Sequence, residues 1–189
     1  GGQTKIMTFL FCDIVGFTPI SEKLQDRPEE LVELINRLLT QLTECVLEQG
    51  GTVDKFMGDC IMAFWGAPID CPDHAERAIL TAQAMLQKLE YLNKQLSSEG
   101  LPELNVGIGI NTGPCVVGNM GSETRFDYSV LGDAVNTASR LEGQTRNYAE
   151  WVLIGENTAN TQPTWVQYVD DLTVKGKSEP LKVFTLKGA

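Results

Sequence analysis

Basic residues are scarce in this sequence, and that scarcity argues against one class of partner. The 189 residues include 15 Lys and Arg against 25 Asp and Glu, which gives a formal net charge of -10. Proteins that bind nucleic acid or anionic membranes present a strongly basic face. We therefore expect no nucleic-acid partner and no membrane contact for this chain.

Paired cysteines and long hydrophobic runs are also missing. The five cysteines are an odd number without a CxxC spacing, which favours free thiols and a reducing, cytoplasmic location. The apolar run Ile6–Cys12 is too short to span a bilayer and precedes no export cleavage site. Residues 1–5 are interpreted as a cloning remnant and N-terminal lead-in, so we expect a sensor or membrane domain upstream in a longer protein.

What the sequence does contain is an ordinary globular composition, with 42% hydrophobic and 21% charged residues. A chain of this length buries about 70% of its unfolded surface, which is enough for a core without disulfide or metal support. No repeat, low-complexity stretch or long linker divides it. Residues 6–187 are therefore expected to form a single domain.

The hydrophobic pattern predicts an alternation of strands and helices. Strand-forming segments are expected at residues 6–12, 52–56, 60–65, 104–110, 115–118, 126–131, 151–154 and 166–184, and helices at 26–49, 73–96 and 132–146. This order resembles the ferredoxin-like split βαβ plan of the α+β class. We expect a mostly antiparallel sheet with helices packed on one face and extra C-terminal strands.

Two aspartates lie at the ends of predicted buried strands. Asp13 follows the first strand, and Asp59 begins the second strand of a predicted hairpin. If the strands are neighbours, the two carboxylates repel each other and need a cation, for which Mg²⁺ or Mn²⁺ is suited. A pair of such ions supports in-line displacement at phosphorus. Either aspartate alone would equally well end a strand or form a turn.

The residues around these aspartates are suited to a phosphate substrate. The turn at Gly16 could aim backbone N–H groups at phosphate oxygens. Lys55 lies in a strand that is otherwise expected to be buried, either as a snorkelling edge residue or as a recognition donor.

A second polar set lies on the helix predicted at 132–146. Asn136 and Arg140 are four residues apart and therefore share one helical face. An amide can position a ribose, and an arginine fork can stabilise a phosphate transition state. The alternative is a solvated face on which Arg140 pairs with Asp133 or Glu142.

Four blocks of the sequence resemble the signature blocks of class III nucleotidyl cyclase catalytic domains. They are FCDIVGFT (11–18), GTVDKFMGD (51–59), DYSVLGDAVNTASR (127–140) and VKGKSEP (174–180). The resemblance extends from residue 6 to residue 186, with the blocks in order and suitably spaced. It implies that residues 6–187 form one catalytic domain of this family, of the adenylyl cyclase type.

The resemblance implies roles for the residues near the phosphates. Asp13, Asp59 and the Ile14 carbonyl would bind two divalent cations, Mg²⁺ or Mn²⁺. The β- and γ-phosphates would meet the backbone amides of Ile14, Val15, Gly16, Phe17 and Thr18.

The resemblance also implies how the rest of the nucleotide would be held. Lys55 and Ser129 fall on the two base-reading positions, where Lys55 can donate to adenine N1 and Ser129 can accept from the exocyclic amine. Asn136 would orient the ribose and Arg140 would stabilise the transition state at the α-phosphate. Lys175 would contact the terminal phosphates.

The reaction that the resemblance implies is attack of the ATP ribose 3′-hydroxyl on the α-phosphate, which gives 3′,5′-cyclic AMP and pyrophosphate. Family members act as dimers, so we expect a homodimer in which the aspartates of one chain face the Lys, Asn and Arg of the other.

Pro114 stands where some members have a phosphate-contacting arginine, so that contact is not expected. The single histidine, His74, lies outside the four blocks and is interpreted as structural.

Two alternative functions stay open. A guanylyl cyclase would be expected to have Glu at position 55 instead of Lys. A catalytically silent nucleotide-binding dimerisation module would lack one of the site residues, and none is missing. A diguanylate cyclase shares the sheet plan, but its Gly-Gly-Asp/Glu-Glu-Phe tip is absent from the hairpin at Met57-Gly58-Asp59.

Overall fold

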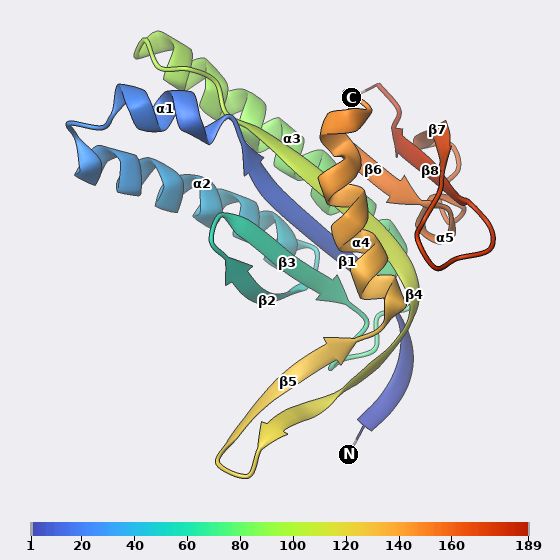
Figure 1. Ribbon diagram of the computed structural model, residues 1–189. Helices are drawn as coiled ribbons and strands as arrows, with labels where there is room; N and C mark the ends of the chain where they lie inside the picture. The colour runs from blue at the N-terminus through green and yellow to red at the C-terminus, as the bar shows by residue number, and fades with distance from the viewer. Residues whose placement is uncertain (1, 189) are drawn as a thin grey trace.

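The computed structural model describes residues 2–188, which form helices packed on one mixed sheet (Figure 1). In chain order the elements are β1 (Gly2–Val15), α1 (Phe17–Lys23), α2 (Pro28–Glu48), β2 (Thr52–Met57), β3 (Cys60–Trp65), α3 (His74–Ser98), β4 (Asn105–Ser122), β5 (Arg125–Leu131), α4 (Asp133–Gln144), the 3₁₀ helix η1 (Thr145–Asn147), β6 (Val152–Gly155), α5 (Glu156–Ala159), β7 (Val166–Leu172) and β8 (Leu181–Leu186). The expected α+β class is confirmed. Within the described chain, no helix is both long and apolar enough to cross a membrane.

A long antiparallel pair of strands forms the centre of the sheet. β1 and β4 pair from Gly2 opposite Gly118 to Val15 opposite Asn105. The strand order is β2-β3-β1-β4-β6-β8-β7, and β5 pairs with the far part of β4. The β4–β6 pair is parallel and the other described pairs are antiparallel. Figure 1 shows β5 and the end of β4 as a two-stranded arm that extends beyond the other strands.

Helices cover both faces of this sheet, so the expectation of helices on one face is wrong. Leu10 and Ile14 belong to the core formed with α2 and α3, whereas Phe9 and Phe11 belong to the core beneath α4. The cause is that successive residues of β1 point to opposite faces and both sets are apolar. Figure 1 shows α4 in front of the sheet and α3 behind it.

Both central strands are longer than the sequence predicted. β1 begins at Gly2 rather than Ile6, because residues of the expected lead-in pair with the arm of β4. β4 is a single strand where two were expected, and Pro114 lies inside it. Proline is tolerated there because β6 pairs with β4 up to Ile110 and β5 pairs from Val116 onward, so that edge of β4 has no strand partner at position 114.

Two other boundaries also differ from the predictions. α2 begins at Pro28 with Arg27 as its N-cap, and no side chain caps it, so Asp26 does not have the expected capping role. The segment 166–184 is divided into β7 and β8 by a loop in which Gly176 has a φ of 85°. A positive φ of this size favours glycine and ends the extended conformation.

Glycines of β4 allow α4 to lie directly against the sheet. A Cβ on Gly109 would lie 2.3 Å from the Ala138 oxygen and 2.3 Å from the Glu142 nitrogen. Both are backbone atoms of α4, so no side chain larger than hydrogen fits. The close approach fixes the position of the C-terminal end of α4 over β4.

Candidate active site

Asp13 and Asp59 lie at the same end of the sheet. Asp13 is opposite Cys60 in the β1–β3 pair, and Asp59 immediately precedes Cys60 at the hairpin tip. The two carboxylates interact: the pKa of Asp13 is raised, first by burial and then by the negative charge of Asp59. The Arg146 guanidinium opposes this rise in part. The structure therefore brings the two predicted metal ligands together.

The Asp13 carboxylate has one oxygen with a hydrogen-bond donor and one without. Oδ2 accepts a hydrogen bond from Arg146 Nη2 at 3.1 Å. Oδ1 is buried and has no hydrogen-bond partner among the described residues. A buried carboxylate oxygen without a donor is costly unless a cation neutralises it. Together with Asp59, this oxygen fits a divalent cation.

Arg146 and Glu142 complete this charged cluster, although neither was predicted to be a site residue. Arg146 Nη1 donates to the Glu142 backbone oxygen at 3.0 Å and also to the Glu142 carboxylate. Glu142 is buried, and burial raises its pKa. The spacing of four residues was a signal for this ion pair. The contact with Asp13 could not be predicted because it depends on where α4 ends over β1.

The proposed phosphate loop follows Asp13 without a break. Ile14 and Val15 end β1, Gly16 is the N-cap of α1, and Phe17 and Thr18 begin that helix. Gly16 has a φ of 85°, which is a left-handed conformation that favours glycine. No side chain caps α1, so its first N–H groups have no side-chain acceptor at the N-cap.

The predicted base-reading residues lie on separate strands. Lys55 is exposed on β2, where its Nζ lies 3.4 Å from an Asp54 carboxylate oxygen. Ser129 is half-buried on β5, and its hydroxyl donates to the Asp127 backbone oxygen at 3.2 Å. Within residues 2–188 no hydrogen bond joins Lys55 to Ser129. The structure therefore does not by itself bring this pair together.

Asn136 and Arg140 lie on the exposed face of α4. Neither side chain has a hydrogen bond or ion pair with another described residue. The alternative pairing of Arg140 does not occur, since Asp133 pairs with Lys177 and Glu142 pairs with Arg146. The exposed face of α4 thus presents an amide and an unpaired guanidinium.

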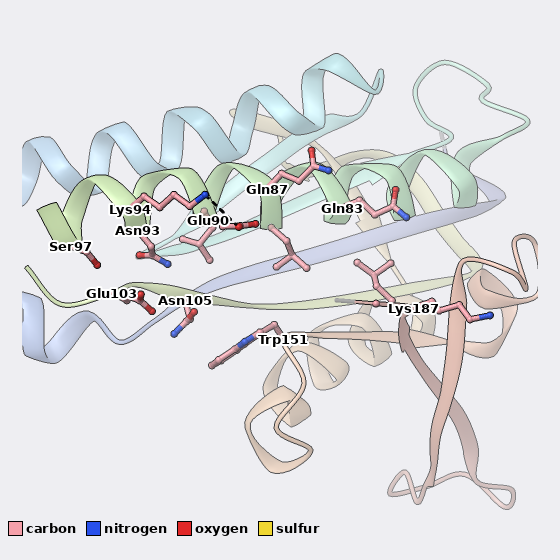
Figure 2. A pocket seen from close by; sticks show the side chains of 14 residues that line it. Gln83, Gln87, Glu90, Asn93, Lys94, Ser97, Glu103, Asn105, Trp151 and Lys187 are labelled. Carbon is pink, nitrogen blue, oxygen red and sulfur yellow. Dashed lines mark ion pairs between the residues drawn. The ribbon is translucent and has the colours of Figure 1, made fainter.

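Lys175 is also exposed, in the loop between β7 and β8. Three of the predicted site residues, Asn136, Arg140 and Lys175, are therefore exposed on the surface. A groove of about 740 Å³ lies elsewhere, between α3 and the strand ends near Asn105 and Trp151 (Figure 2). None of the predicted site residues lines that groove.

Residues 2–188 match the family model described as the adenylate and guanylate cyclase catalytic domain. The chain belongs to this family. Catalytic domains of the family are metal-dependent and typically dimeric. The Asp13–Asp59 pair of this cyclase domain is a donor set that fits such a requirement.

Curated relatives of the cyclase domain include two bacterial adenylate cyclases. The adenylate cyclase of Anabaena cylindrica is 40% identical over 191 residues, which cover 98% of this chain and 37% of that protein. Adenylate cyclase 1 of Rhizobium meliloti (strain 1021) is 36% identical over 184 residues, which cover 96% of this chain and 27% of that protein. The cyclase domain thus spans well under half the length of these relatives.

Solved structures with the same fold include both nucleotide specificities. The adenylyl cyclase CyaB from P. aeruginosa superposes with a TM-score of 0.87 at 36% identity, covering 100% of this chain and 97% of that chain. The guanylyl cyclase Cya2 superposes with a TM-score of 0.83 at 35% identity, covering 100% and 96%. Similarity to these two structures fixes the fold, while the choice of base depends on individual residues.

Proposed function

We propose that this cyclase domain is an adenylyl cyclase that converts ATP into 3′,5′-cyclic AMP and pyrophosphate at sites shared by two copies of the chain. The observation that carries the proposal is the division of the site residues over two surfaces. Asp13 and Asp59 form a carboxylate pair with an unsatisfied buried oxygen. Asn136 and Arg140 lie on an exposed helix face with no partner among the described residues.

The geometry of α4 supports the shared site. Arg146, just beyond this helix, contacts Asp13 of the same chain. Because a helix rises 1.5 Å per residue, Arg140 and Asn136 lie about 9 and about 15 Å further along the axis. Both also face outward, so they are badly placed to act on a substrate at their own Asp13. A two-fold dimer would supply the same face from a second copy and would create two equivalent sites.

At the metal end, Asp13, Asp59 and the Ile14 carbonyl would hold two divalent cations, Mg²⁺ or Mn²⁺. When bound, these ions favour the alkoxide form of the ribose 3′-hydroxyl and neutralise the leaving pyrophosphate. The backbone amides of residues 14–18 would donate to the β- and γ-phosphates. Gly16 allows the chain to turn there without a side chain in the way.

At the other end, residues of the second copy would position the nucleotide. Arg140 would donate to the α-phosphate oxygens, whose negative charge grows in the transition state. Asn136 would orient the ribose so that the 3′-oxygen is in line with the bond to be broken. Lys175 would contact the terminal phosphates.

Lys55 supports adenine over guanine. An ammonium group has only donors, and adenine N1 is an acceptor, whereas guanine N1 carries a hydrogen. Ser129 has a hydroxyl that can accept from the adenine amine. Guanylyl cyclase is the second candidate because Cya2 is 35% identical to this chain, and Lys55 is the residue that opposes it.

The shared site is tested by mixing two inactive variants. Asp59→Ala removes a metal ligand and Arg140→Ala removes the phosphate donor, so each homodimer is inactive. After subunit exchange at equal concentrations, half of the dimers are mixed and each has one intact site, so about a quarter of wild-type activity returns. Mixing Asp59→Ala with Asp13→Ala is the control, because every site then lacks a ligand. No activity in demonstrably mixed Asp59→Ala and Arg140→Ala dimers would contradict the proposal.

A further inference from the structure

We infer that Arg146 competes with metal ions for the Asp13 carboxylate and so sets the metal affinity of the proposed site. The inference rests on the proposed function, because it takes Asp13 and Asp59 as the metal ligands. It concerns a residue outside the four sequence blocks that resemble the cyclase family. Arg146 is a positioning residue in this account and touches no substrate.

The two terminal nitrogens of Arg146 hold different partners. Nη1 donates to the backbone oxygen and carboxylate of Glu142, and it lies 3.3 Å from Thr145 Oγ1. Nη2 donates to Asp13 Oδ2 at 3.1 Å. The guanidinium is therefore anchored at the end of α4 by one nitrogen and directed at β1 by the other.

The sheet provides the space for this arrangement. Gly107 of β4 lies directly opposite Asp13 of β1. A Cβ at Gly107 would lie 2.6 Å from Thr145 Oγ1, 2.9 Å from Glu142 Oε2 and 3.0 Å from Arg146 Nη1. The polar ends of these three side chains therefore occupy room that only glycine leaves beside Asp13. The contact between Arg146 and Asp13 is built into the packing of α4 on β4.

Arg146 supplies positive charge to a cluster of carboxylates. Burial is the largest cause of the raised pKa values of Asp13 and Glu142, and the negative charges of the neighbouring carboxylates raise these pKa values further. Arg146 is the cation that pairs with two of these carboxylates. Arg146 thus neutralises part of the negative charge that bound metal ions would neutralise.

Metal binding at Asp13 would oppose this arrangement. Asp13 is one of the two carboxylates in the proposed ligand set, in which water and phosphate oxygens would complete the coordination of the cations. Arg146 holds Oδ2 of this carboxylate, and a guanidinium and a divalent cation on one carboxylate repel each other. Metal binding and the Arg146–Asp13 contact are therefore linked, and each weakens the other by the same factor.

The test is a Mn²⁺ titration of the metal-free dimer without nucleotide, in which electron paramagnetic resonance measures the free ion. Arg146→Gln removes the contact, and we expect the apparent Kd for Mn²⁺ to fall about fivefold, as for a partly exposed ion pair of ordinary strength. Arg146→Lys keeps the local charge but has one nitrogen in place of the two that bind Glu142 and Asp13 separately, so its contact with Asp13 is weaker and its Kd also falls. Arg77→Gln is the matched control, because Arg77 pairs with Asp73 at the start of α3, and its Kd stays at the wild-type value.

Thermal melting first establishes that each variant folds, and the Lys variant carries the test if the Gln variant does not. An unchanged or weaker Mn²⁺ affinity in the folded Arg146 variants would overturn the inference. Tighter Mn²⁺ binding by Arg146→Gln but not by Arg146→Lys would also overturn it, because the cause would then be the lost charge and not the lost contact. Equally tighter binding by Arg77→Gln would overturn it as well. Failure of the proposed metal site looks different: wild type would bind no Mn²⁺, or Asp59→Ala would bind it as tightly as wild type.

Discussion

Replacing Gly109 by alanine tests the packing that positions α4. The new Cβ would lie 2.3 Å from the Ala138 oxygen, 2.3 Å from the Glu142 nitrogen and 2.9 Å from the Glu142 Cα. All three are backbone atoms of the helix, so no side-chain rotation relieves the overlap. α4 would have to move away from β4 and carry Arg140 and Arg146 with it.

The expected cost follows from this geometry. Overpacking of a core costs about 1–3 kcal/mol, and the upper end applies because the neighbours are backbone. For a chain of this size, each kcal/mol lowers Tm by about 2–4 °C, so Gly109→Ala should lower Tm by about 6–12 °C. Gly143→Ala is the control, since Gly143 is exposed on α4 with nothing within 4 Å of its added Cβ. Alanine favours a helix by about 1 kcal/mol, which raises Tm by about 2–4 °C.

Circular dichroism melting of the two variants beside wild type makes the comparison. The two variants are predicted to change Tm in opposite directions, although both changes add one methyl group to the same helix–sheet unit. Cyclase activity should fall in Gly109→Ala and stay near wild type in Gly143→Ala. A Gly109→Ala protein that melts within about 2 °C of wild type would refute the close backbone contact between α4 and β4.

Two further predictions concern base selectivity and pH. Changing Lys55→Glu together with Ser129→Cys should lower kcat/KM for ATP by at least about tenfold, because the donor to adenine N1 is lost. Unchanged selectivity between ATP and GTP would show that these two residues do not recognise the base. Burial lowers the pKa of His74 below its ordinary value of 6.5, so the unfolded chain binds the proton more readily and stability falls as pH drops through about 6.5. Melting curves between about pH 7.5 and 5.5 should show a smaller decrease of Tm in His74→Gln than in wild type, and equal decreases would contradict the assignment.

The parts of the fold that could be predicted from sequence are those set by local pattern. The hairpin of β2 and β3 follows from two strand-like runs separated by Met57-Gly58-Asp59, and α3 follows from its apolar spacing. The continuity of β4 through Pro114 could not be predicted, because it depends on where β5 and β6 stop pairing. The face that α4 covers also depends on tertiary packing, since β1 offers apolar residues on both sides.

Part of the candidate site could also be predicted from local sequence, and part could not. The closeness of Asp13 and Asp59 could be predicted because each stands at the end of an apolar strand, and the structure shows that these strands, β1 and β3, are neighbours. The contact between Arg146 and Asp13 could not be predicted, because nothing in the sequence around Arg146 indicates that the end of α4 reaches Asp13. That contact depends on Gly107 and Gly109, whose missing side chains allow the helix to approach.

Analysis of the reaction products distinguishes an adenylyl cyclase from the alternative functions. The purified chain, at concentrations where it is dimeric, is incubated with ATP and GTP in parallel, with Mg²⁺ and with Mn²⁺, and the nucleotides are separated and quantified. We predict 3′,5′-cyclic AMP and equimolar pyrophosphate from ATP, in excess of any cyclic GMP from GTP, and no product after the metal is chelated. Predominant cyclic GMP, or no cyclic nucleotide from either substrate with either ion, would contradict this prediction.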